Sequence, residues 1–416
     1  TGGAPPYVGT QWLVRPANAL QIVNPANPPN DLSQAHTLLR AGNVAQAQAV
    51  CRAALAHRPD DRDALRLLGQ LLTQTGKFGE AAPLLRRAIV MNAADGELPF
   101  YLAQSLIGLG RDDEAISVLT TALRGRAVHV PMTKALASAL HRVGRVDEMR
   151  ATLGDAVFRL GATPAATELI EHWLSLIPDD TAPAHRLAAL RGDAPPARAA
   201  DAYVTYLFDR YAETFDDSLS RLGYHGPALI GQLLQAMGVT PNGQWRVLDA
   251  GCGTGLCAPI VRPFADHLTG VDLSSAMIEK ARERGGYDEL VVAELTEYLG
   301  RDAAQFDLII SADTLIYFGD LSALLLRAAH ALRPAGWFAF TVEKTDDDAD
   351  VLGYRLNTNT RYSHSKAYVT QALAATGFVL RAMNETTIRE GDGEPQLGWA
   401  VLAQRVSALS SGAPAA

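Results

Sequence analysis

The chain of 416 residues is 48% hydrophobic and 20% charged, and its formal charge is -8. This composition is typical of a soluble globular protein with two or more domains, and no run of 18 apolar residues occurs that could span a bilayer. We count 18 Lys and Arg against 17 Asp and Glu in residues 31–191, but 18 against 28 from residue 192 to the end. The acidic C-terminal half argues against broad electrostatic binding of nucleic acid.

Cysteine is used sparingly. Cys51, Cys252 and Cys257 are too few and too scattered for a disulfide framework, and no C-x-x-C pair suggests a zinc or redox site. We therefore expect a reducing, cytoplasmic setting and no metal site. A start at Thr1 is consistent with a processed or truncated terminus, and we recognise no signal peptide near it.

The first thirty residues are rich in Pro, Gly and Asn. They contain only QWLVR and LQIV as candidate short strands. We therefore predict that residues 1–30 form a flexible or loosely docked arm, and that regular structure begins near Asp31.

From Asp31 onward the sequence repeats with a period of 34 residues. The repeated positions are Gly42, Gly76, Gly110 and Gly144; Leu38, Leu72, Leu106 and Leu140; Ala54, Ala88, Ala122 and Ala156; and Ala47, Ala81 and Ala115, with Met149 in the fourth place. A glycine can end a helix in a left-handed conformation, and alanines let neighbouring helices pack closely. Each unit is therefore predicted to be a pair of helices.

This period and pattern resemble the tetratricopeptide repeat over residues 31–161. A further amphipathic pair, at 165–177 and 182–190, lacks the spacing and is expected to close the stack. We predict a helical repeat domain over 31–191, followed by a linker at 192–200 with the sequence GDAPPARAA. The resemblance implies a groove that binds a protein or peptide partner.

From Trp245 onward, strand-like and helix-like segments alternate. The strand-like segments are WRVLDAG, HLTGVD, ELVVAE, FDLIISAD, WFAFTVE, FVLRAMNE and LGWAVLAQ. Helical stretches between the first six predict a doubly wound, Rossmann-like α/β domain with seven strands over residues 201–416. Ligands of such sheets bind beyond the carboxyl ends of the strands, so residues at those ends are candidates for a site.

The first of these strands ends in VLDAGCGTGL, where Gly251, Gly253 and Gly255 follow Asp249. Glycines permit a tight turn and the approach of a ligand to the backbone, and the next helix offers free N–H groups. A glycine loop alone serves nicotinamide, flavin and S-adenosylmethionine binders alike. The compressed G-C-G-T-G spacing and the preceding acid, which would repel a pyrophosphate, favour S-adenosylmethionine.

Two more acids end the next two strands. Asp272 can accept hydrogen bonds from both ribose hydroxyls, and Glu294 ends the third strand beside the expected adenine position. Each acid also has a simpler interpretation. Asp249 could cap the glycine loop, Asp272 could cap the helix that begins SSAMIEKA, and Glu294 could stand at a solvated helix start.

Together these segments resemble the class I S-adenosylmethionine-dependent methyltransferases from about Tyr203 to Gln404, and most resemble predicted bacterial methyltransferases that carry tetratricopeptide repeats. The resemblance implies binding of S-adenosylmethionine and of its product, S-adenosylhomocysteine. It implies a lid over the cofactor from the helix that contains YAETFDD, residues 211–217. The cofactor-binding residues that it implies are Tyr211, Phe215, Asp249, Gly251, Gly253, Asp272, Leu273, Glu294, Leu295 and Ala312.

The methyl acceptor is expected beyond the fourth and fifth strands. Asp313, Tyr317 and Phe318 follow the fourth strand, where relatives line the wall between cofactor and acceptor, although helix packing would also explain the two rings. A basic and aromatic cluster follows the fifth strand and consists of Tyr354, Arg355, Arg361, Tyr362, His364 and Lys366. Such a cluster can hold a carboxylate or phosphate, and His364 can act as a base near neutral pH. Alternatively, these charges neutralise the preceding DDDAD acids, or Ser363 caps the next helix.

We take His364, Asp313 and Tyr317 as candidate catalytic residues, and Tyr354, Arg355, Arg361 and Tyr362 as candidate acceptor-binding residues. The resemblance implies an enzyme that methylates an oxygen or nitrogen of a small molecule or peptide, with the repeats docking a partner or the acceptor. The alternative is a scaffold that binds the cofactor without turnover. A nicotinamide oxidoreductase is disfavoured by the compressed glycine loop.

Overall fold

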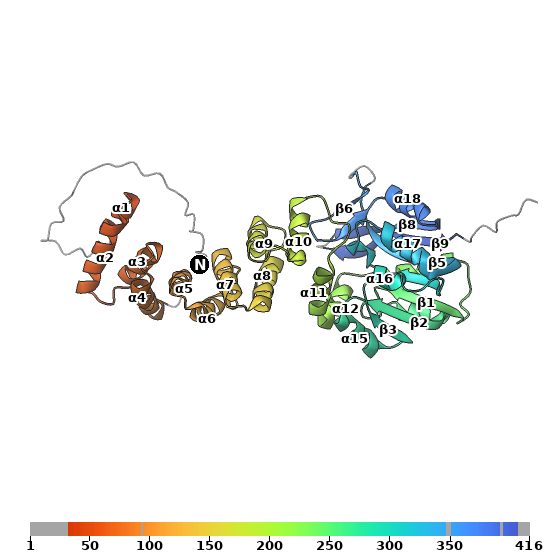
Figure 1. The fold of residues 1–416 in the computed structure, drawn as a ribbon, viewed down its shortest axis with the longest axis horizontal. Helices are drawn as coiled ribbons and strands as arrows, with labels where there is room; N and C mark the ends of the chain where they lie inside the picture. The colour runs from red at the N-terminus through yellow and green to blue at the C-terminus, as the bar shows by residue number, and fades with distance from the viewer. Residues whose placement is uncertain (1–31, 93–94, 347–350, 392–393, 407–416) are drawn as a thin grey trace, which may run out of the picture. The chain divides into compact units, whose positions relative to one another are not determined.

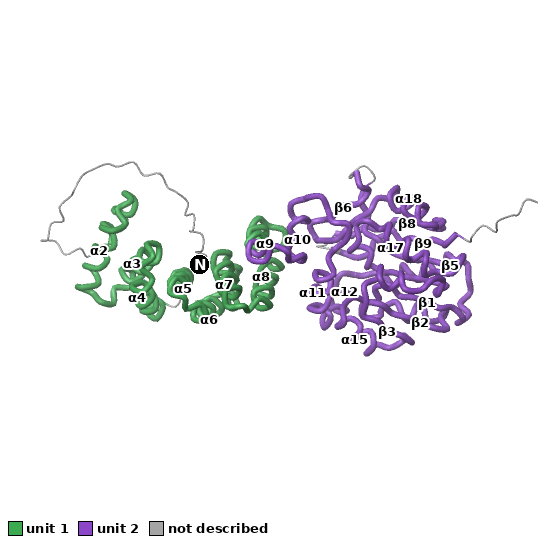
Figure 2. Tube along the Cα trace, in the orientation of Figure 1, with its two compact units in different colours: residues 1–172 green, residues 173–416 purple. Residues whose placement is uncertain are grey.

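The computed structural model describes residues 32–92, 95–346, 351–391 and 394–406, so the arm predicted at residues 1–30 lies outside the described residues. The chain divides into two compact units, Thr1–His172 and Trp173–Ala416 (Figures 1 and 2). Within the described ranges, no helix combines the length and the apolar character that a membrane crossing requires.

The first unit is a series of antiparallel helix pairs. Its helices are α1 Ser33–Arg40, α2 Val44–His57, α3 Arg62–Gln74, α4 Phe78–Met91, α5 Leu98–Gly108, α6 Asp112–Leu123, α7 Val130–Arg142 and α8 Val146–Leu160, and α9 Pro164–Leu176 extends across the division. The four glycines on the 34-residue spacing have φ between 71° and 78°. After each of them, the next residue donates its N–H to the carbonyl of the repeated leucine, as Lys77 does to Leu72 at 2.8 Å. The predicted helix pairs are confirmed.

The predicted linker is part of the second unit. The helix before it, α10 Thr181–Arg191, accompanies it there, and His185 Nε2 lies 3.2 Å from the Thr360 carbonyl oxygen. In the linker itself, Ala199 donates its N–H to the Tyr317 carbonyl at 2.8 Å, and the Ala197 carbonyl accepts from Gly319 at 2.8 Å. The structural division therefore falls earlier in the chain than the expected boundary. A Pro-rich composition indicates that a segment is not helical, but it does not indicate whether the segment makes contacts with a domain.

The second unit is built on one sheet, and all seven predicted strands are present. They are β1 Trp245–Ala250, β2 Ala265–Asp272, β3 Glu289–Val292, β4 Phe306–Ser311, β5 Leu332–Lys344, β8 Phe378–Gly391 and β9 Glu394–Arg405. The order is β3-β2-β1-β4-β5 with parallel pairing, and β9 then pairs antiparallel with both β5 and β8. A hairpin of β6 Tyr354–Leu356 and β7 Tyr362–His364 lies beside the carboxyl end of β5, with which β7 pairs in parallel. The described sheet therefore has nine strands where we predicted seven.

Helices cover both faces of this sheet (Figure 1). Val247 belongs to a core cluster with α13 Gly226–Ala236 and α14 Ala258–Val261, whereas the adjacent Leu248 belongs to a cluster with α16 Leu295–Leu299, α17 Ser322–Ala331 and α18 Lys366–Ala375. This alternation follows from the two-residue period of a strand. The remaining short elements are α11 Asp201–Tyr211, η1 Ala212–Thr214, α12 Phe215–Arg221, η2 Arg262–Phe264, α15 Ser275–Arg284 and η3 Leu315–Tyr317.

Candidate active site

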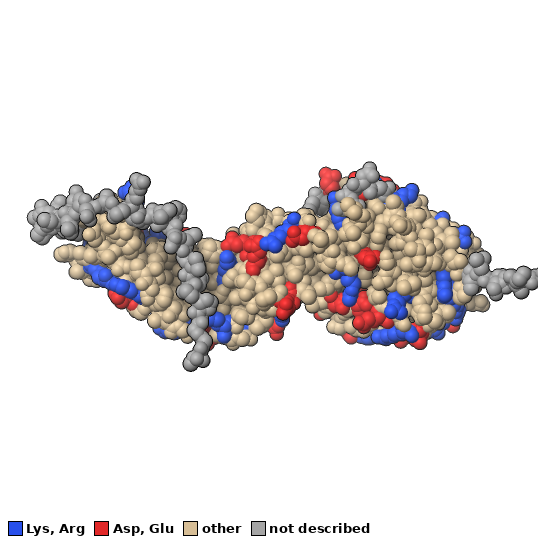
Figure 3. Space-filling model, turned by 45° about the horizontal axis from the view of Figure 1, so that its top comes forward, with Lys and Arg blue, Asp and Glu red and all other residues tan. Residues whose placement is uncertain are grey.

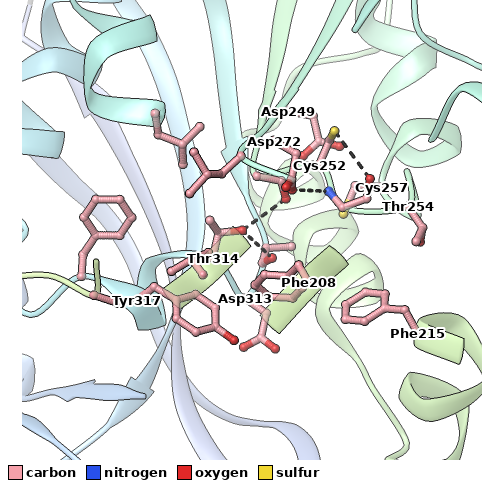
Figure 4. A pocket seen from close by; sticks show the side chains of 18 of the residues that line it. Phe208, Phe215, Asp249, Cys252, Thr254, Cys257, Asp272, Asp313, Thr314 and Tyr317 are labelled. Atoms are coloured by element: carbon pink, nitrogen blue, oxygen red, sulfur yellow. Dashed lines mark hydrogen bonds between the residues drawn. The ribbon is translucent and has the colours of Figure 1, made fainter. Parts of the chain in front are cut away.

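A pocket opens at the carboxyl ends of β1, β2 and β4, where the sheet architecture predicts a ligand. Figure 4 shows Asp249 and Asp272 on one side of it, and the rings of Phe208 and Tyr317 with Asp313 on another. All of the predicted cofactor-binding residues except Tyr211 line this pocket. They are Phe215, Asp249, Gly251, Gly253, Asp272, Leu273, Glu294, Leu295 and Ala312.

The three loop glycines serve different purposes. Gly251 has φ 79°, and a Cβ on it would lie 2.2 Å from Thr314 Oγ1, so protein packing excludes a side chain there. Gly255 has φ 88°, and a Cβ would lie 3.1 Å from the Tyr287 ring. Gly253 differs, because at φ 53° its nearest neighbour would be the Phe215 ring at 3.9 Å. Gly253 is therefore the glycine that keeps pocket space open for a ligand.

Asp272 is fixed by backbone donors on both sides. Its Oδ2 accepts from the Gly253 N–H at 2.9 Å, and its Oδ1 accepts from the Ser274 N–H at 2.9 Å. Burial raises the pKa of Asp272, while these backbone hydrogen bonds oppose the rise. Ser274 is the residue that caps α15, since its Oγ accepts from the Met277 N–H at 3.1 Å. Asp272 is therefore not needed as a side-chain cap.

Asp249 is 1% exposed and accepts a hydrogen bond from the Tyr287 hydroxyl at 2.6 Å on Oδ2. Burial raises the pKa of Asp249 to about 7, the Tyr287 hydrogen bond opposes this rise, and the Asp272 charge adds to it. A buried carboxylate of this kind gains strongly from a cationic ligand, because such a ligand offsets the desolvation of the charged form.

Glu294 both caps a helix and faces the pocket. Its Oε2 accepts from the Glu297 N–H at 2.8 Å at the start of α16. Its Oε1 is buried without a hydrogen-bond partner, although Arg198 Nη1 lies 3.5 Å away. A buried carboxylate oxygen that lacks a donor can accept one from a ligand. The alternative of a solvated helix start is therefore wrong in one respect, because Glu294 does cap the helix but its side chain is only 8% exposed.

The predicted lid segment around YAETFDD is not one helix but consists of α11, η1 and α12, and its role as a lid stays a prediction. Phe208 and Phe215 line the pocket from it, with ring centroids 5.8 Å apart in an edge arrangement. Asp216 anchors it, because its Oδ1 accepts from Thr254 Oγ1 at 2.6 Å and Arg284 binds the other oxygen. Tyr211 is not among the lining residues, because α11 ends there and the chain turns through η1.

On the far side of the pocket, Asp313 belongs to a buried ion network. Arg389 Nη1 lies 2.6 Å from both Asp313 carboxylate oxygens, and its Nη2 binds Glu343. Arg361 lines the pocket 3.8 Å from Glu343 and donates a hydrogen bond to the Tyr317 hydroxyl oxygen. Burial raises the pKa of Tyr317 to about 12. Asp313 has φ 58°, a strained backbone for a residue other than glycine.

Sequence reasoning missed Arg389. It is 2% exposed, and a register irregularity in β8 between Thr387 and Arg389 accompanies its inward position. An arginine within the strand-like run TTIREG was the available signal, but its two carboxylate partners lie 46 and 76 positions away in the chain.

The structure does not bring His364 to the pocket. Its side chain is fully buried on β7, its Nε2 lies 3.0 Å from the Gly319 carbonyl oxygen, and its ring stacks on Tyr368 at 5.8 Å. Burial lowers the pKa of His364 to about 4. A neutral imidazole in this position cannot reach a substrate in the pocket. Ser365, and not Ser363, caps the following helix.

Three of the four predicted acceptor-binding residues also lie outside the pocket lining. Tyr362 donates its hydroxyl to the Pro196 carbonyl at 2.8 Å, and the Tyr354 ring packs edge-on against Tyr368 at 5.4 Å. Arg355 is exposed and donates to Asn357 Oδ1 at 3.0 Å. The β6–β7 hairpin pairs these residues with the sheet, and only Arg361, at its turn, faces the pocket.

Sequence comparison finds family matches in both parts of the chain. Residues 248–340 match the methyltransferase domain family, and residues 32–99 and 72–129 match tetratricopeptide repeat families. Aklanonic acid methyltransferase DauC of a Streptomyces species is 33% identical over 145 residues, which are 33% of this chain and 64% of that protein. The malonyl-[acyl-carrier protein] O-methyltransferase of Salmonella typhimurium is 37% identical over 95 residues, which are 23% and 38% of the two chains. The chain thus spans less than two thirds of the length of these relatives.

Among solved structures, an S-adenosylmethionine-dependent methyltransferase from Mesorhizobium loti is 25% identical, with a TM-score of 0.34 over 44% of this chain and 97% of that one. The family matches agree with the helix pairs of the first unit and with the strand order and glycine loop of the second. The chain combines N-terminal tetratricopeptide repeats with a class I methyltransferase domain.

Proposed function

We propose that the protein transfers a methyl group from S-adenosylmethionine to an oxygen or nitrogen of a small-molecule or peptide acceptor. The observation that carries this proposal is the set of three acids around the open space at Gly253, of which Asp249 and Glu294 are buried and Asp272 is half-buried. Asp249 and Asp272 lie at the carboxyl ends of β1 and β2, and Glu294 follows the end of β3 by two residues, so each acid would meet a different part of the cofactor. The methyltransferase family match supports the same activity.

Each acid fits a different part of the cofactor. Asp249 would bind the ammonium of the methionine part, Asp272 the ribose hydroxyls, and Glu294 Oε1 the adenine amino group. Leu273, Leu295 and Ala312 supply apolar contacts beside them. The bound cofactor supplies an electrophilic methyl group, and the protein's task is to align the acceptor and exclude water. The aromatic rings of the predicted lid, Phe208 and Phe215, are suited to excluding water.

The acceptor would lie between the lid and Arg361. The rings of Phe208, Phe215 and Tyr317 favour an apolar body, and the Arg361 guanidinium favours a carboxylate or phosphate on it. Asp313, held by Arg389, is the candidate to receive a proton from a hydroxyl or amine. A carboxylate that is itself methylated would need no base.

The repeats would dock a protein or peptide partner. Charged side chains on the repeat helices are already paired, as Arg66 is with Asp95 at 3.0 Å and Lys134 with Glu168 at 3.0 Å. On the face drawn in Figure 3, acidic and basic side chains are interspersed over both units. A partner of mixed charge therefore fits better than a lone carboxylate. The three cysteines are unpaired and buried, which supports the cytoplasm as the proposed setting.

Calorimetric titration with S-adenosylmethionine and S-adenosylhomocysteine tests the cofactor assignment. Asp272→Ala should weaken both affinities by about tenfold or more, since hydrogen bonds to charged groups contribute roughly 1.5 to 3 kcal/mol each and do not add fully. Asp272→Asn, which keeps the shape, separates the loss of charge from the loss of contact. Unchanged dissociation constants in both variants would remove Asp272 from the site.

Turnover is tested with isotopically labelled S-adenosylmethionine and a cell lysate of the source organism. Transfer of label to a lysate component is the expected result, and isolation of that component identifies the acceptor. Cofactor binding with no label transfer would support the alternative of a scaffold without catalysis. Failure to bind either nucleoside would refute the proposed function itself.

A further inference from the structure

Tyr287 lies directly under the glycine loop, in the turn between α15 and β3. Its ring occupies space left by two glycines, because a Cβ on Gly255 would lie 3.1 Å from the ring and one on Gly270 would lie 2.8 Å from it. The space beside these two glycines, the Tyr287 slot, fixes the position of the ring. The Tyr287 hydroxyl then donates to Asp249 Oδ2 at 2.6 Å, a length typical of a strong hydrogen bond from an O–H to a carboxylate.

The surroundings of Asp249 give this hydrogen bond unusual weight. The titratable groups that act on Asp249 or are acted on by it are Asp272 on β2, Cys252 and Cys257 around the glycine loop, Tyr224 after α12, and Tyr287. None of these groups is a cation. Within the described residues, no hydrogen bond reaches the other oxygen, Oδ1, and Asp249 lines the pocket. Tyr287 is thus the side chain that orients this carboxylate before a ligand arrives.

We propose that Tyr287 is a positioning residue for cofactor binding, whose hydroxyl holds Asp249 so that Oδ1 faces the ammonium of the bound methionine part. This inference rests on the proposed function. It assigns Tyr287 no contact with the cofactor, since Tyr287 does not line the pocket. Tyr287 instead acts on the orientation and the ionisation of the Asp249 carboxylate.

The ionisation of Asp249 makes cofactor affinity depend on pH, and a purely structural role of Tyr287 would leave that dependence unchanged. An ammonium ligand requires ionised Asp249, and burial raises the pKa of Asp249 to about 7. Affinity should therefore be full above this pH and should fall as the pH drops through it. The Tyr287 hydroxyl favours the ionised form, so its removal raises this pKa further and moves the loss of affinity to higher pH.

Tyr287→Phe tests the proposal, because phenylalanine fills the same slot and lacks only the hydroxyl. The probe is S-adenosylhomocysteine, titrated calorimetrically into the full chain between pH 6 and pH 9. We expect about a fivefold to tenfold weaker affinity at pH 7. The pH at which affinity has fallen halfway should also be higher by about one pH unit than in the unaltered protein. Tyr298→Phe is the matched control, since Tyr298 on α16 is half-buried and does not line the pocket. An unshifted midpoint in Tyr287→Phe would overturn the proposal.

Asp249→Asn supplies the second arm. In that background, adding Tyr287→Phe should change affinity by less than about twofold, because the carboxylate that the hydroxyl acts on is gone. An equal loss in both backgrounds would show that Tyr287 acts elsewhere, and would overturn the inference while leaving the proposed function standing. If the unaltered protein does not bind S-adenosylhomocysteine at any pH, the proposed function and this inference both fail.

Discussion

The two sides of the pocket are held in place by different means. On the cofactor side, Asp272 is fixed by the backbone N–H groups of Gly253 and Ser274, which belong to the turns after β1 and β2. On the acceptor side, Asp313 is fixed by the long side chain of Arg389 from β8. Backbone donors are set by the local turn, whereas an ion network depends on several distant segments meeting. The cofactor side should therefore respond to local backbone changes, and the acceptor side to single charge deletions.

Gly253→Val should have the largest effect, because it acts on the cofactor side at the backbone itself. A side chain there would enter pocket space near Phe215 at a φ of 53°, and we expect at least about a 100-fold loss of S-adenosylhomocysteine affinity. Gly377→Val is the matched control, since Gly377 has φ 88° and no neighbour within 4 Å of its Cβ position. Both variants should lose roughly 1 to 3 kcal/mol of stability from backbone strain. Equal binding losses in the two variants would mean that strain, and not pocket space, explains the effect.

Arg361→Met should have the next largest effect and should act on the acceptor side alone. Once the acceptor is identified, we expect its KM to rise by about tenfold or more while S-adenosylhomocysteine affinity stays within about twofold. Arg355→Met is the control, since Arg355 belongs to the same hairpin but does not line the pocket. A parallel fall of cofactor and acceptor affinity in Arg361→Met would indicate a role in holding the network together.

The contrast between the two sides also explains what the sequence could predict. The strands, the helix pairs, and the positions of Asp249, Asp272 and Gly253 depend on periodicity and on contacts within adjacent turns, which a single sequence displays. The acceptor side depends on the β6–β7 hairpin, whose pairing buried His364 and left Arg361 at the pocket. A polar cluster in sequence does not reveal which of its members a hairpin turns inward, so four of its predicted site residues lie elsewhere.

His364→Asn tests whether His364 belongs to the site, because we expect it to change the pH dependence of stability and not the reaction rate. Loss of a general base typically costs about 100-fold, but a buried His364 outside the pocket should change kcat by less than about threefold. Because burial lowers the pKa of His364 to about 4, the stability it contributes is present above pH 6.5 and is lost as the pH falls from 6.5 toward 4. The loss should approach about 3 kcal/mol at most.

Urea unfolding at several pH values measures this contribution. Between pH 6.5 and pH 4 the unaltered protein should lose more stability than His364→Asn, and the difference between the two isolates His364, because the raised pKa of Asp249 acts in the opposite direction equally in both proteins. His185, whose pKa burial also lowers, leaves a residual slope in the variant. A 100-fold loss of rate in His364→Asn at full cofactor affinity would restore His364 as a base.

The smallest effect on the cofactor side is expected from removing the repeats, provided the cut respects the structure. Arg198 and Ala199 line the pocket, and Ala197 and Ala199 are hydrogen-bonded to the segment around Tyr317 and Gly319. A chain that begins at Ala199 therefore loses part of the pocket wall. A chain that begins at Asp180, the N-cap residue of α10, keeps that wall and should bind S-adenosylhomocysteine within about twofold of the full chain.

Methylation by the chain that begins at Asp180 should nevertheless fall if the repeats deliver the acceptor or its carrier. Tethering a partner raises its effective concentration to roughly millimolar, so the loss should be greatest at low acceptor concentration and should shrink as free acceptor is added. Since the cofactor site is untouched, the apparent KM for the acceptor should rise while kcat at saturation stays the same. Equal methylation by the truncated and full chains at every acceptor concentration would show that the repeats serve a partner unrelated to the acceptor.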